Sequence, residues 1–451
     1  MRDLTKSVFT FPWAISMFGV QQIVNLVAPP ADGRIAGSTA AIDAVSQAAE
    51  QQLDGWLDET LQIGKTVQRT LVDLTLLRPP SIDSSGLMRV ATDRRWSPLF
   101  EPTLEYGLPP IAWLDSFRLD REDSPAALQE FANKLRIIQV VTEVRAQLNL
   151  DKAGDEPLTA LLDRAATLQA FPRLWAVEEL GHHYADRALA RSGSADPQDL
   201  LTDESMAGLP PWSLSMLHAG IGMSFARFVL ARLGPTPSSD VVRHAVTRFA
   251  VLCRRSSRRG YTGAALESLG LAARVLHQHL VPLLDREIPL VEPELHGYFW
   301  HGAGRAMYFA PANMLPSSNA PRTMISNLER EAPHELAYRN ALAGISWETT
   351  IVNMQNPEVM ELFLRHHGAV AATHDAFANG VSSAIVMRYD TTPDDPHITR
   401  FVTHEPRTTD AAAAWRSVVT SPCHVALERT YGELRQAWAL GQLFHYRPSP
   451  A

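Results

Sequence analysis

The stretch from His296 to Phe309 constrains the fold more than any other part of the chain. It reads HGYFWHGAGRAMYF, a run of large apolar residues interrupted by glycine and alanine. Residues three or four apart share one side of a helix, so Phe299, Gly302 and Ala306 form a stripe where another helix can approach closely. Because each glycine costs a helix roughly 1 kcal/mol, we expect close packing or ligand contact to compensate. The stretch predicts a helix with a small-residue notch in an apolar face.

Related patterns recur through the second half of the chain. Similar stretches lie 78 residues after this one and 82 residues before it. The segment LGLA at 269–272 also has a similar counterpart, AGIS, at 343–346. The shifts match His296, Phe299, Gly302 and Ala306 with His374, Phe377, Gly380 and Ala384, and match Gly302 and Gly304 with Gly220 and Gly222. Almost no stretch alternates polar and apolar residues with a period of two, as a half-buried strand would. We therefore expect an all-α fold of tandem helical repeats, arranged as a solenoid or a compact superbundle.

Proline and glycine divide the chain into four expected regions. These are an N-terminal amphipathic helical region at 1–78, an irregular linker at 79–124, the helical-repeat domain at 125–390, and a polar loop with a C-terminal docking helix at 391–451. The helices expected after the linker span residues 124–150, 158–168, 174–190, 214–233, 241–254, 264–284, 296–309, 324–330, 334–353, 357–365, 373–387 and 410–444.

The N-terminal region contains the most apolar stretch, residues 8–28. Lys6 precedes it as in a signal peptide or membrane anchor, but Pro12 and the amide side chains of its second half argue against a spanning or cleaved segment. We expect a helix that either docks on the rest of the protein or lies on a lipid surface. The long amphipathic helix expected to follow, up to about residue 76, requires a partner helix or another chain, which leaves a homo-oligomer open.

Composition excludes several classes of function. The net charge of -8 and the pI near 6.1 argue against a nucleic-acid-binding protein, and the arginine-rich run at 254–259 is expected to be a solvated loop. No lysine follows Lys152, so the region after it lacks an amine for Schiff-base or P-loop chemistry. Cys253 and Cys423 are too few for a disulfide framework or a thiolate zinc site, and a reducing cytoplasm is the expected location.

Polar groups within apolar helices are the strongest candidates for a site. Arg305, Glu348 and Glu267 each stand among apolar residues, and a buried charge must be paired, so we expect a structural salt bridge from Arg305 to either acid. Alternatively, these groups face a cavity, where they orient a carboxylate or polarise a carbonyl while His301 or Tyr308 donates a proton. The residues expected to contact a ligand are Trp300, His301, Arg305, Tyr308, Trp347, Glu348 and Glu267.

No motif indicates a metal or a cofactor. A histidine cluster at 366–374 is interrupted by Gly368, and the glycines at 302–304 lie inside a helical pattern, where they form a packing notch rather than a phosphate cradle. A GxSxG nucleophile elbow after a strand is missing, and the acids at 394–395 lack the third carboxylate of a magnesium-diphosphate clamp. No catalytic residue is therefore assigned, and the sequence leaves open whether the protein is an enzyme.

Two resemblances add to this reading. HAGIG at 218–222 with FAR at 225–227, GAGRAMYF at 302–309 and LAGIS at 342–346 resemble a bacterial family of unknown function whose members occur beside the polyketide synthases of enediyne biosynthesis. The resemblance covers roughly residues 170–385 and implies a biosynthetic role on a hydrophobic polyketide or lipid, without a catalytic residue to carry over. Residues 8–76 resemble the phasins of bacterial polyester granules in composition, which implies binding to a granule surface.

The sequence thus predicts a helical-repeat protein of bacterial secondary metabolism that binds a hydrophobic small molecule, polyketide or lipid-like. It would be cytoplasmic and attach to a membrane or granule through residues 8–76. The alternative is a cofactor-independent enzyme, of cyclase or isomerase type, that acts on a polyketide or isoprenoid in a cavity between helices.

Overall fold

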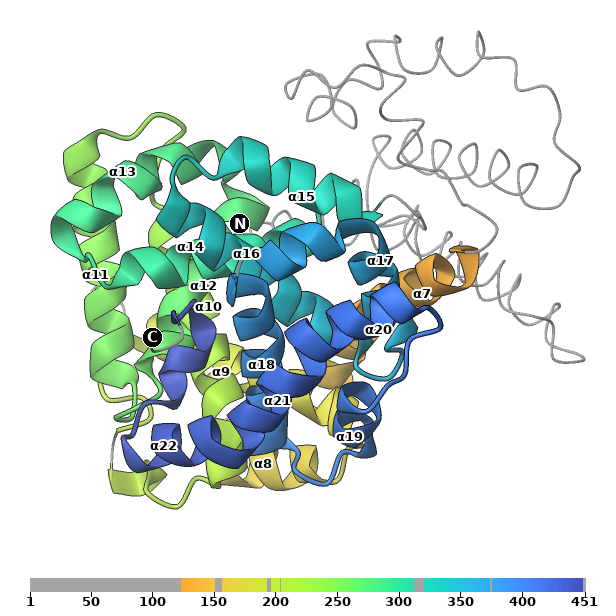
Figure 1. Ribbon diagram of the computed structural model, residues 1–451. Coiled ribbons are helices and arrows are strands. Elements are labelled where there is room, and N and C mark those ends of the chain that lie inside the picture. Colours follow the sequence, from red (N-terminus) through yellow and green to blue (C-terminus); the bar gives the residue numbers. More distant parts are fainter. Residues whose placement is uncertain are drawn as a thin grey trace, which may run out of the picture. The chain divides into compact units, whose positions relative to one another are not determined.

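The notched stretches are helices, and they pack on one another through their small residues. The computed structural model describes residues 123–150, 156–192, 196–202, 204–310, 313, 320–373 and 375–448, and no strand occurs among them (Figure 1). These residues belong to one compact unit, Leu114–Ala451. The all-α prediction is confirmed. The expected N-terminal helices and the linker lie outside the described residues.

Sixteen α-helices are described, and they differ in their role in the unit. They are α7 (Ser124–Gln147), α8 (Leu158–Ala166), α9 (Ala170–Ser192), α10 (Leu214–Leu230), α11 (Ser239–Ser256), α12 (Thr262–Leu276), α13 (Val281–Val291), α14 (Leu295–Tyr308), α15 (Ala320–Glu331), α16 (Glu335–Asn353), α17 (Glu358–Thr373), α18 (Asp375–Thr391), α19 (Pro396–Val402), α20 (Thr409–Trp415), α21 (Ser421–Val425) and α22 (Tyr431–Gln436). The short turns named below are η3 (Pro211–Ser213), η6 (Arg416–Thr420), η7 (Ala426–Thr430) and η8 (Leu440–Phe444).

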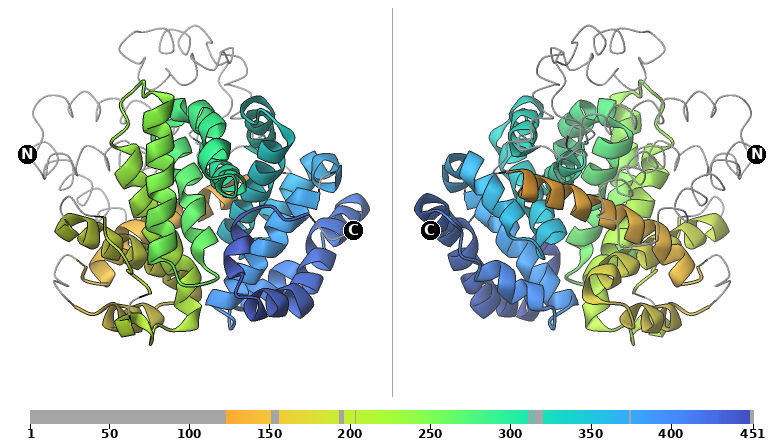
Figure 2. Two further views of the ribbon diagram at one scale, coloured as in Figure 1. Left: turned by 90° about the vertical axis from the view of Figure 1, so that its left-hand side faces the viewer. Right: turned by 90° about the vertical axis from the view of Figure 1, so that its right-hand side faces the viewer.

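An inner row of helices forms the core of the unit. Helices α9, α10, α12, α14, α16 and α18 pack side by side in this order, while α11, α13, α15 and α17 lie at the outer edge (Figure 1). Helix α7 runs across one face and packs on α9, α16 and α17 (Figure 2). From α10 onward, one outer helix connects each helix of the row to the next. Helices α14 and α16 run parallel, because Arg305 bonds Glu348 and, further along both helices, Tyr308 bonds Asn353.

One reciprocal contact recurs at every step of this row. In each pair of neighbouring helices, a small residue of one helix packs against a backbone carbonyl of the other, and the reverse contact is also made. The carbonyl belongs to the residue three positions before the other helix's own small residue. Between α14 and α16, a Cβ at Gly304 would collide with the carbonyl of Ala341, and a Cβ at Gly344 would collide with that of His301. The five pairs are Gly181 with Gly220, Gly222 with Ser268, Gly270 with Gly302, Gly304 with Gly344, and Ser346 with Gly380.

Serine takes the place of glycine at two of these positions. The Ser268 hydroxyl donates to the carbonyl of Ala219 at 3.0 Å, and the Ser346 hydroxyl donates to that of Phe377 at 2.9 Å. At the glycines the Cα–H faces the carbonyl instead, a contact worth perhaps 0.5–1 kcal/mol, and the close backbones add dispersion attraction. The predicted notches are therefore confirmed as sites of helix contact. The tandem-repeat and solenoid readings stay predictions.

The paired small residues explain how one helix is held on two sides. Gly302 and Gly304 are two positions apart, which places them about 200° apart around α14. Gly302 accordingly faces α12 and Gly304 faces α16.

The rest of the core is a continuous apolar cluster that includes Phe299, Trp347 and Phe377. Within the described residues, one helical segment, Pro211–Leu230, is long and apolar enough to cross a membrane, and 83% of its most apolar window is buried inside the protein.

The expected helix at 264–284 is wrong, because it is two helices. Helix α12 ends at Leu276, and His277 has non-helical dihedrals, with φ of -143°. Pro282 lacks a backbone N–H and is therefore favoured in the first turn of a helix, and it stands there in α13. The break turns the chain from the inner row to the outer edge.

The C-terminal expectations also need correction. The expected polar loop after residue 390 contains α19, because Asp395 caps this helix by accepting the His397 N–H at 3.0 Å and Pro396 occupies its first turn. The expected single helix at 410–444 passes through two π-helical segments, η6 and η7. Pro422 follows η6, and it has no backbone N–H to donate to the carbonyl four residues back, while its ring crowds that carbonyl. The helix ends at Gln436, before η8.

Candidate functional site

Five of the seven side chains expected at a ligand site meet in one buried ionic cluster. Arg305 Nη1 donates to Glu267 Oε2 at 2.7 Å, and Arg305 Nε donates to Glu348 Oε2 at 2.5 Å. His301 Nδ1 bonds the other oxygen of Glu267, Oε1, at 2.5 Å. The guanidinium also stacks over the Trp347 ring, 4.3 Å from its centre. The expected salt bridge is confirmed, and Arg305 uses both acids rather than one.

The helix contacts explain why these groups meet. His301 supplies the carbonyl against which Gly344 packs, and Arg305 stands one turn further along α14. Glu348 stands one turn beyond Gly344 on α16, so the parallel helices bring it opposite Arg305. The notch between α14 and α16 therefore sets the position of the cluster.

Burial and charge act against each other within the cluster. Arg305, Glu267 and Glu348 are each buried. Burial raises the pKa of Glu267, but the charges of Arg305 and His301 outweigh it and the net pKa lies below the usual value. For Glu348 burial prevails over Arg305, and its pKa is raised. Its Oε1 is buried without a hydrogen-bond partner among the described residues. The cluster thus holds one ionised carboxylate and one carboxyl that resists ionisation.

Glu178 on α9 adds a second carboxyl of this kind. Burial raises its pKa to about 7, although Arg305 opposes the shift, and the nearby Glu348 and Glu267 reinforce it. Part of its surface nevertheless remains accessible. A carboxyl with a pKa of about 7 would gain and lose a proton near neutral pH, and Glu178 stands on α9, the first helix of the inner row. Sequence reasoning missed it because nothing in its local pattern distinguishes it from a surface glutamate.

The other two expected ligand contacts lie elsewhere. Trp300 points to α13, where its Nε1 donates to Asp285 Oδ1 at 2.7 Å. The Tyr308 hydroxyl accepts from Asn353 Nδ2 at 2.8 Å, and Lys134 of α7 lies over its ring. The structure thus separates these two from the ionic cluster, and the ligand-contact role of all seven residues stays a prediction.

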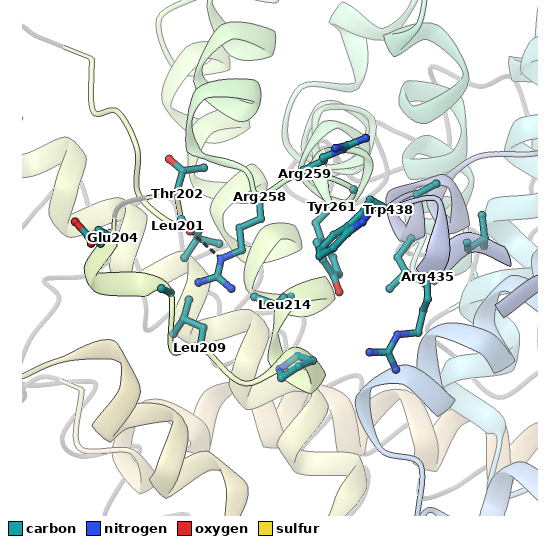
Figure 3. A pocket seen from close by; sticks show the side chains of 16 residues that line it. Leu201, Thr202, Glu204, Leu209, Leu214, Arg258, Arg259, Tyr261, Arg435 and Trp438 are labelled. Atoms are coloured by element: carbon teal, nitrogen blue, oxygen red, sulfur yellow. Dashed lines mark hydrogen bonds between the residues drawn. The ribbon is translucent and has the colours of Figure 1, made fainter. Parts of the chain in front are cut away.

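A pocket of about 640 Å³ lies where the beginnings of α10 and α12 meet the C-terminal segment (Figure 3). Its wall is largely apolar, with arginines at the rim. The lining residues are Leu201, Thr202, Glu204, Ala207, Leu209, Pro211, Leu214, Arg258, Arg259, Gly260, Tyr261, Leu434, Arg435, Trp438, Ala439 and Leu440.

Two residues with positive φ build one wall of this pocket. Gly260 has φ of 92° and Trp438 has φ of 54°. A Cβ at Gly260 would lie 2.5 Å from the Trp438 carbonyl oxygen, so only glycine allows the two loops to touch. The Gly441 N–H donates to the Gly260 carbonyl at 2.6 Å and fixes the contact. Trp438 is held in a conformation that tryptophan rarely adopts, with 61% of its surface exposed beside the pocket.

Positive charge dominates the pocket, which is lined by three arginines and one glutamate. Arg258 is half-buried, its Nε donates to the Leu201 carbonyl at 3.0 Å, and burial lowers its pKa. No carboxylate of the described residues forms a salt bridge with it. Arg435 donates to the Tyr431 hydroxyl at 3.1 Å. In Figure 3, Arg258 and Arg435 flank Tyr261 and Trp438.

A buried neutral histidine contacts two residues that line the pocket. Tyr261 stacks on His218 with ring centres 5.3 Å apart. His218 Nδ1 donates to the Leu214 carbonyl at 2.6 Å, and its Nε2 accepts the Arg258 backbone N–H at 3.0 Å. Burial lowers the His218 pKa to about 4, which matches this neutral tautomer. The histidine therefore positions the backbone of Arg258 without adding charge.

The expectation of a solvated loop at 254–259 is corrected by this geometry. Arg254 and Arg255 belong to the last turn of α11, and Arg254 pairs with Glu292. Arg258 turns into the pocket. The composition of the run was a signal for anion binding, but sequence alone does not show which arginines have carboxylate partners.

The comparisons with known proteins add no constraint on this site. No protein-family model matches the chain, and neither a curated protein nor a solved structure shows significant similarity to it.

Proposed function

We propose that the protein binds a hydrophobic small molecule that carries an anionic group, and that the pocket beside Arg258 holds it. The observation that carries the proposal is a half-buried guanidinium without a carboxylate partner at the edge of an apolar pocket. Taking a charge partly out of water is costly unless an opposite charge is supplied, and an anionic ligand supplies it.

The dimensions and the wall of the pocket support this ligand class. Small-molecule sites are commonly 300–1,000 Å³, mostly apolar, with a few polar groups that fix orientation. Here Leu209, Leu214 and Leu440 offer the apolar surface, and Tyr261 and Trp438 offer flat aromatic faces. The ligand's apolar body would lie on these residues while its anionic group bonds Arg258.

The resemblances of the sequence narrow the ligand further within the proposal. A polyketide or lipid-like acid from bacterial secondary metabolism fits an apolar wall with an arginine at its edge. A cytoplasmic location and self-association remain part of the proposal. So does attachment to a membrane or granule through residues 8–76, which lie outside the described residues.

Binding of matched probes tests the proposal. We expect isothermal titration calorimetry to detect binding of dodecanoate, and at least about tenfold weaker binding of dodecanol, because a hydrogen bond to a charged group contributes roughly 1.5–3 kcal/mol. Arg258→Met should abolish this preference. Arg254→Met is the matched control from the same arginine run, and should leave it unchanged because Arg254 pairs with Glu292 outside the pocket. Equal affinity for acid and alcohol in the wild type would refute the proposal.

A second candidate function, a cofactor-independent acid–base enzyme, is favoured by Glu178. A carboxyl with a pKa of about 7 near Arg305 has the properties of a general acid or base at neutral pH. Native mass spectrometry would identify a molecule that co-purifies with the protein. Incubation of that molecule with the protein in D₂O should then lead to deuterium uptake that Glu178→Gln abolishes without loss of binding. Equal uptake with both proteins would exclude this role of Glu178.

A further inference from the structure

Two histidines and an aspartate converge at a place that neither the ionic cluster nor the pocket uses. Asp285 comes from α13, His296 from the first turn of α14, and His334 from the N-cap of α16. The Asp285 carboxylate and the Nε2 atoms of both histidines all lie within 4.8 Å of one another. Asp285 Oδ1 is 2.7 Å from His296 Nε2 and 3.1 Å from His334 Nε2.

Hydrogen bonding alone explains this convergence poorly. Trp300 Nε1 also donates to Asp285 Oδ1 at 2.7 Å, so three N–H groups are directed at one oxygen atom. A carboxylate oxygen has two lone pairs, so one of the three donors exceeds its capacity. A cation between the imidazoles and the carboxylate would remove this excess, because the histidines would then direct lone pairs at the ion.

We infer that Asp285, His296 and His334 bind a divalent first-row transition metal ion, with Zn²⁺ as its best probe. Two imidazole nitrogens and one carboxylate oxygen are the ligand types and the ligand number of open zinc and iron(II) sites. In such sites water or a substrate completes the coordination. His334 is 40% exposed in its side chain, whereas Asp285 and His296 are buried, so the open positions would face solvent at His334.

The surroundings fit a metal site in one respect and oppose it in another. The Trp300 N–H would hold the ligating carboxylate, as outer residues commonly do around bound metals. The Nδ1 of His334, however, accepts the Ala337 N–H at 3.1 Å as the cap of α16. Metal binding at Nε2 requires the ring proton to move to Nδ1, and the cap hydrogen bond is then lost. No proton leaves the ring, so the exchange is a change of tautomer. The free energy of metal binding must therefore offset the loss of this cap hydrogen bond. We expect weaker binding than at a site whose ligands make no such bond.

Three variants separate a metal site from a hydrogen-bonded clamp. His334→Asn removes the imidazole and keeps a side-chain oxygen that caps a helix well, so folding is preserved. His296→Gln removes the second nitrogen ligand. His279→Gln is the control, because the exposed His279 lies beside the half-buried His277 with ring centres 6.3 Å apart, and among the described residues no carboxylate joins them in a metal-binding group.

The experiment is calorimetric titration of the metal-free full chain with ZnCl₂, followed by absorption spectroscopy with Co²⁺. We expect one ion per chain, visible d–d bands with Co²⁺, and at least about 100-fold weaker binding in His334→Asn and His296→Gln. His279→Gln should bind like the wild type. The inference is overturned if the wild type takes up no ion, if the first two variants bind Zn²⁺ as well as the wild type, or if His279→Gln is the variant that loses it. Neither dodecanoate nor Arg258 enters this experiment, so its result is independent of the proposed function.

Discussion

Replacement of Gly304 by alanine tests the reciprocal helix contact most directly. A Cβ at this position would lie 2.7 Å from the carbonyl carbon and from the Cα of Ala341, and closer still to its oxygen. These are backbone atoms of a buried helix, so no flexible side chain can move aside. An ordinary contact needs about 3.4 Å, so the two carbon contacts alone require α14 and α16 to separate locally by about 0.7 Å, and the closer oxygen requires a larger separation. The Arg305 to Glu348 hydrogen bond spans the same interface and would be stretched.

The expected loss follows from two opposing effects. Overpacking of a well-packed interior costs typically 1–3 kcal/mol, and the rigid backbone here places Gly304→Ala at the upper end. Alanine gains about 1 kcal/mol over glycine in a helix. We therefore expect a net loss of about 2 kcal/mol in the free energy of unfolding and, for a unit as large as Leu114–Ala451, a fall in melting temperature of only roughly 3 °C.

Gly432→Ala is the matched control. Gly432 lies in α22, and a Cβ there would have no atom within 4 Å. This variant should gain up to about 1 kcal/mol, because only the helix propensity changes. Urea unfolding followed by circular dichroism measures both variants. The reasoning is refuted if Gly304→Ala is as stable as the wild type, or if the two alanines have the same effect.

Two further predictions concern the ionic cluster. Arg305→Met leaves Glu267 and Glu348 without their cation and should lower the free energy of unfolding by about 3–5 kcal/mol, as measured by urea titration. The control Arg429→Met, at an exposed pair with Glu433, should lower it by less than about 1 kcal/mol. Equal losses would contradict a structural role for Arg305. The pKa of Glu178 is about 7 in the folded protein, against an ordinary value of 4.5. Between these pH values the folded state binds more protons than the unfolded state. The contribution of Glu178 to the free energy of unfolding therefore falls as pH rises from 4.5 to 7. Glu178→Gln should therefore be more stable than the wild type at pH 8 by up to about 3 kcal/mol, and the difference should shrink toward pH 4.5; a pH-independent difference in melting temperature would contradict the raised pKa.

The inner row was largely predictable from the sequence. The stripe of Gly302 and Ala306 indicated close helix contact, and the rule that buried charges are paired joined Arg305 to Glu348 and Glu267. Both arguments use local spacing and elementary energetics, so they did not require knowledge of the tertiary structure. Local spacing did not show that Trp300 contacts a different helix from its neighbour His301. One residue turns a helix by about 100°, and Trp300 faces Asp285 on α13.

Local sequence spacing could not predict the pocket or the cluster of Asp285, His296 and His334. The pocket joins segments near residues 201–214, 258–261 and 434–440, and its wall depends on the positive φ of Gly260 and Trp438. Asp285 and His334 are 49 residues apart, and a break in the expected helix at 264–284 separates α12 from the helix that carries Asp285. Contacts between residues so far apart in sequence depend on how the chain turns between helices. The pattern of a single sequence carries little information about those turns.

The reciprocal contact has a consequence for changes in chain length. One residue added or deleted between Gly302 and Gly304 would rotate one of them by about 100° relative to the other, and α14 would then lose its fit to α12 or to α16. No substitution of side chains elsewhere could restore the fit, because the touching atoms are backbone. Insertions and deletions should therefore be tolerated in the segments that join inner and outer helices, and excluded from the middle of the inner helices. A scan of single-residue insertions through α14 and through the segment that follows it would map this boundary.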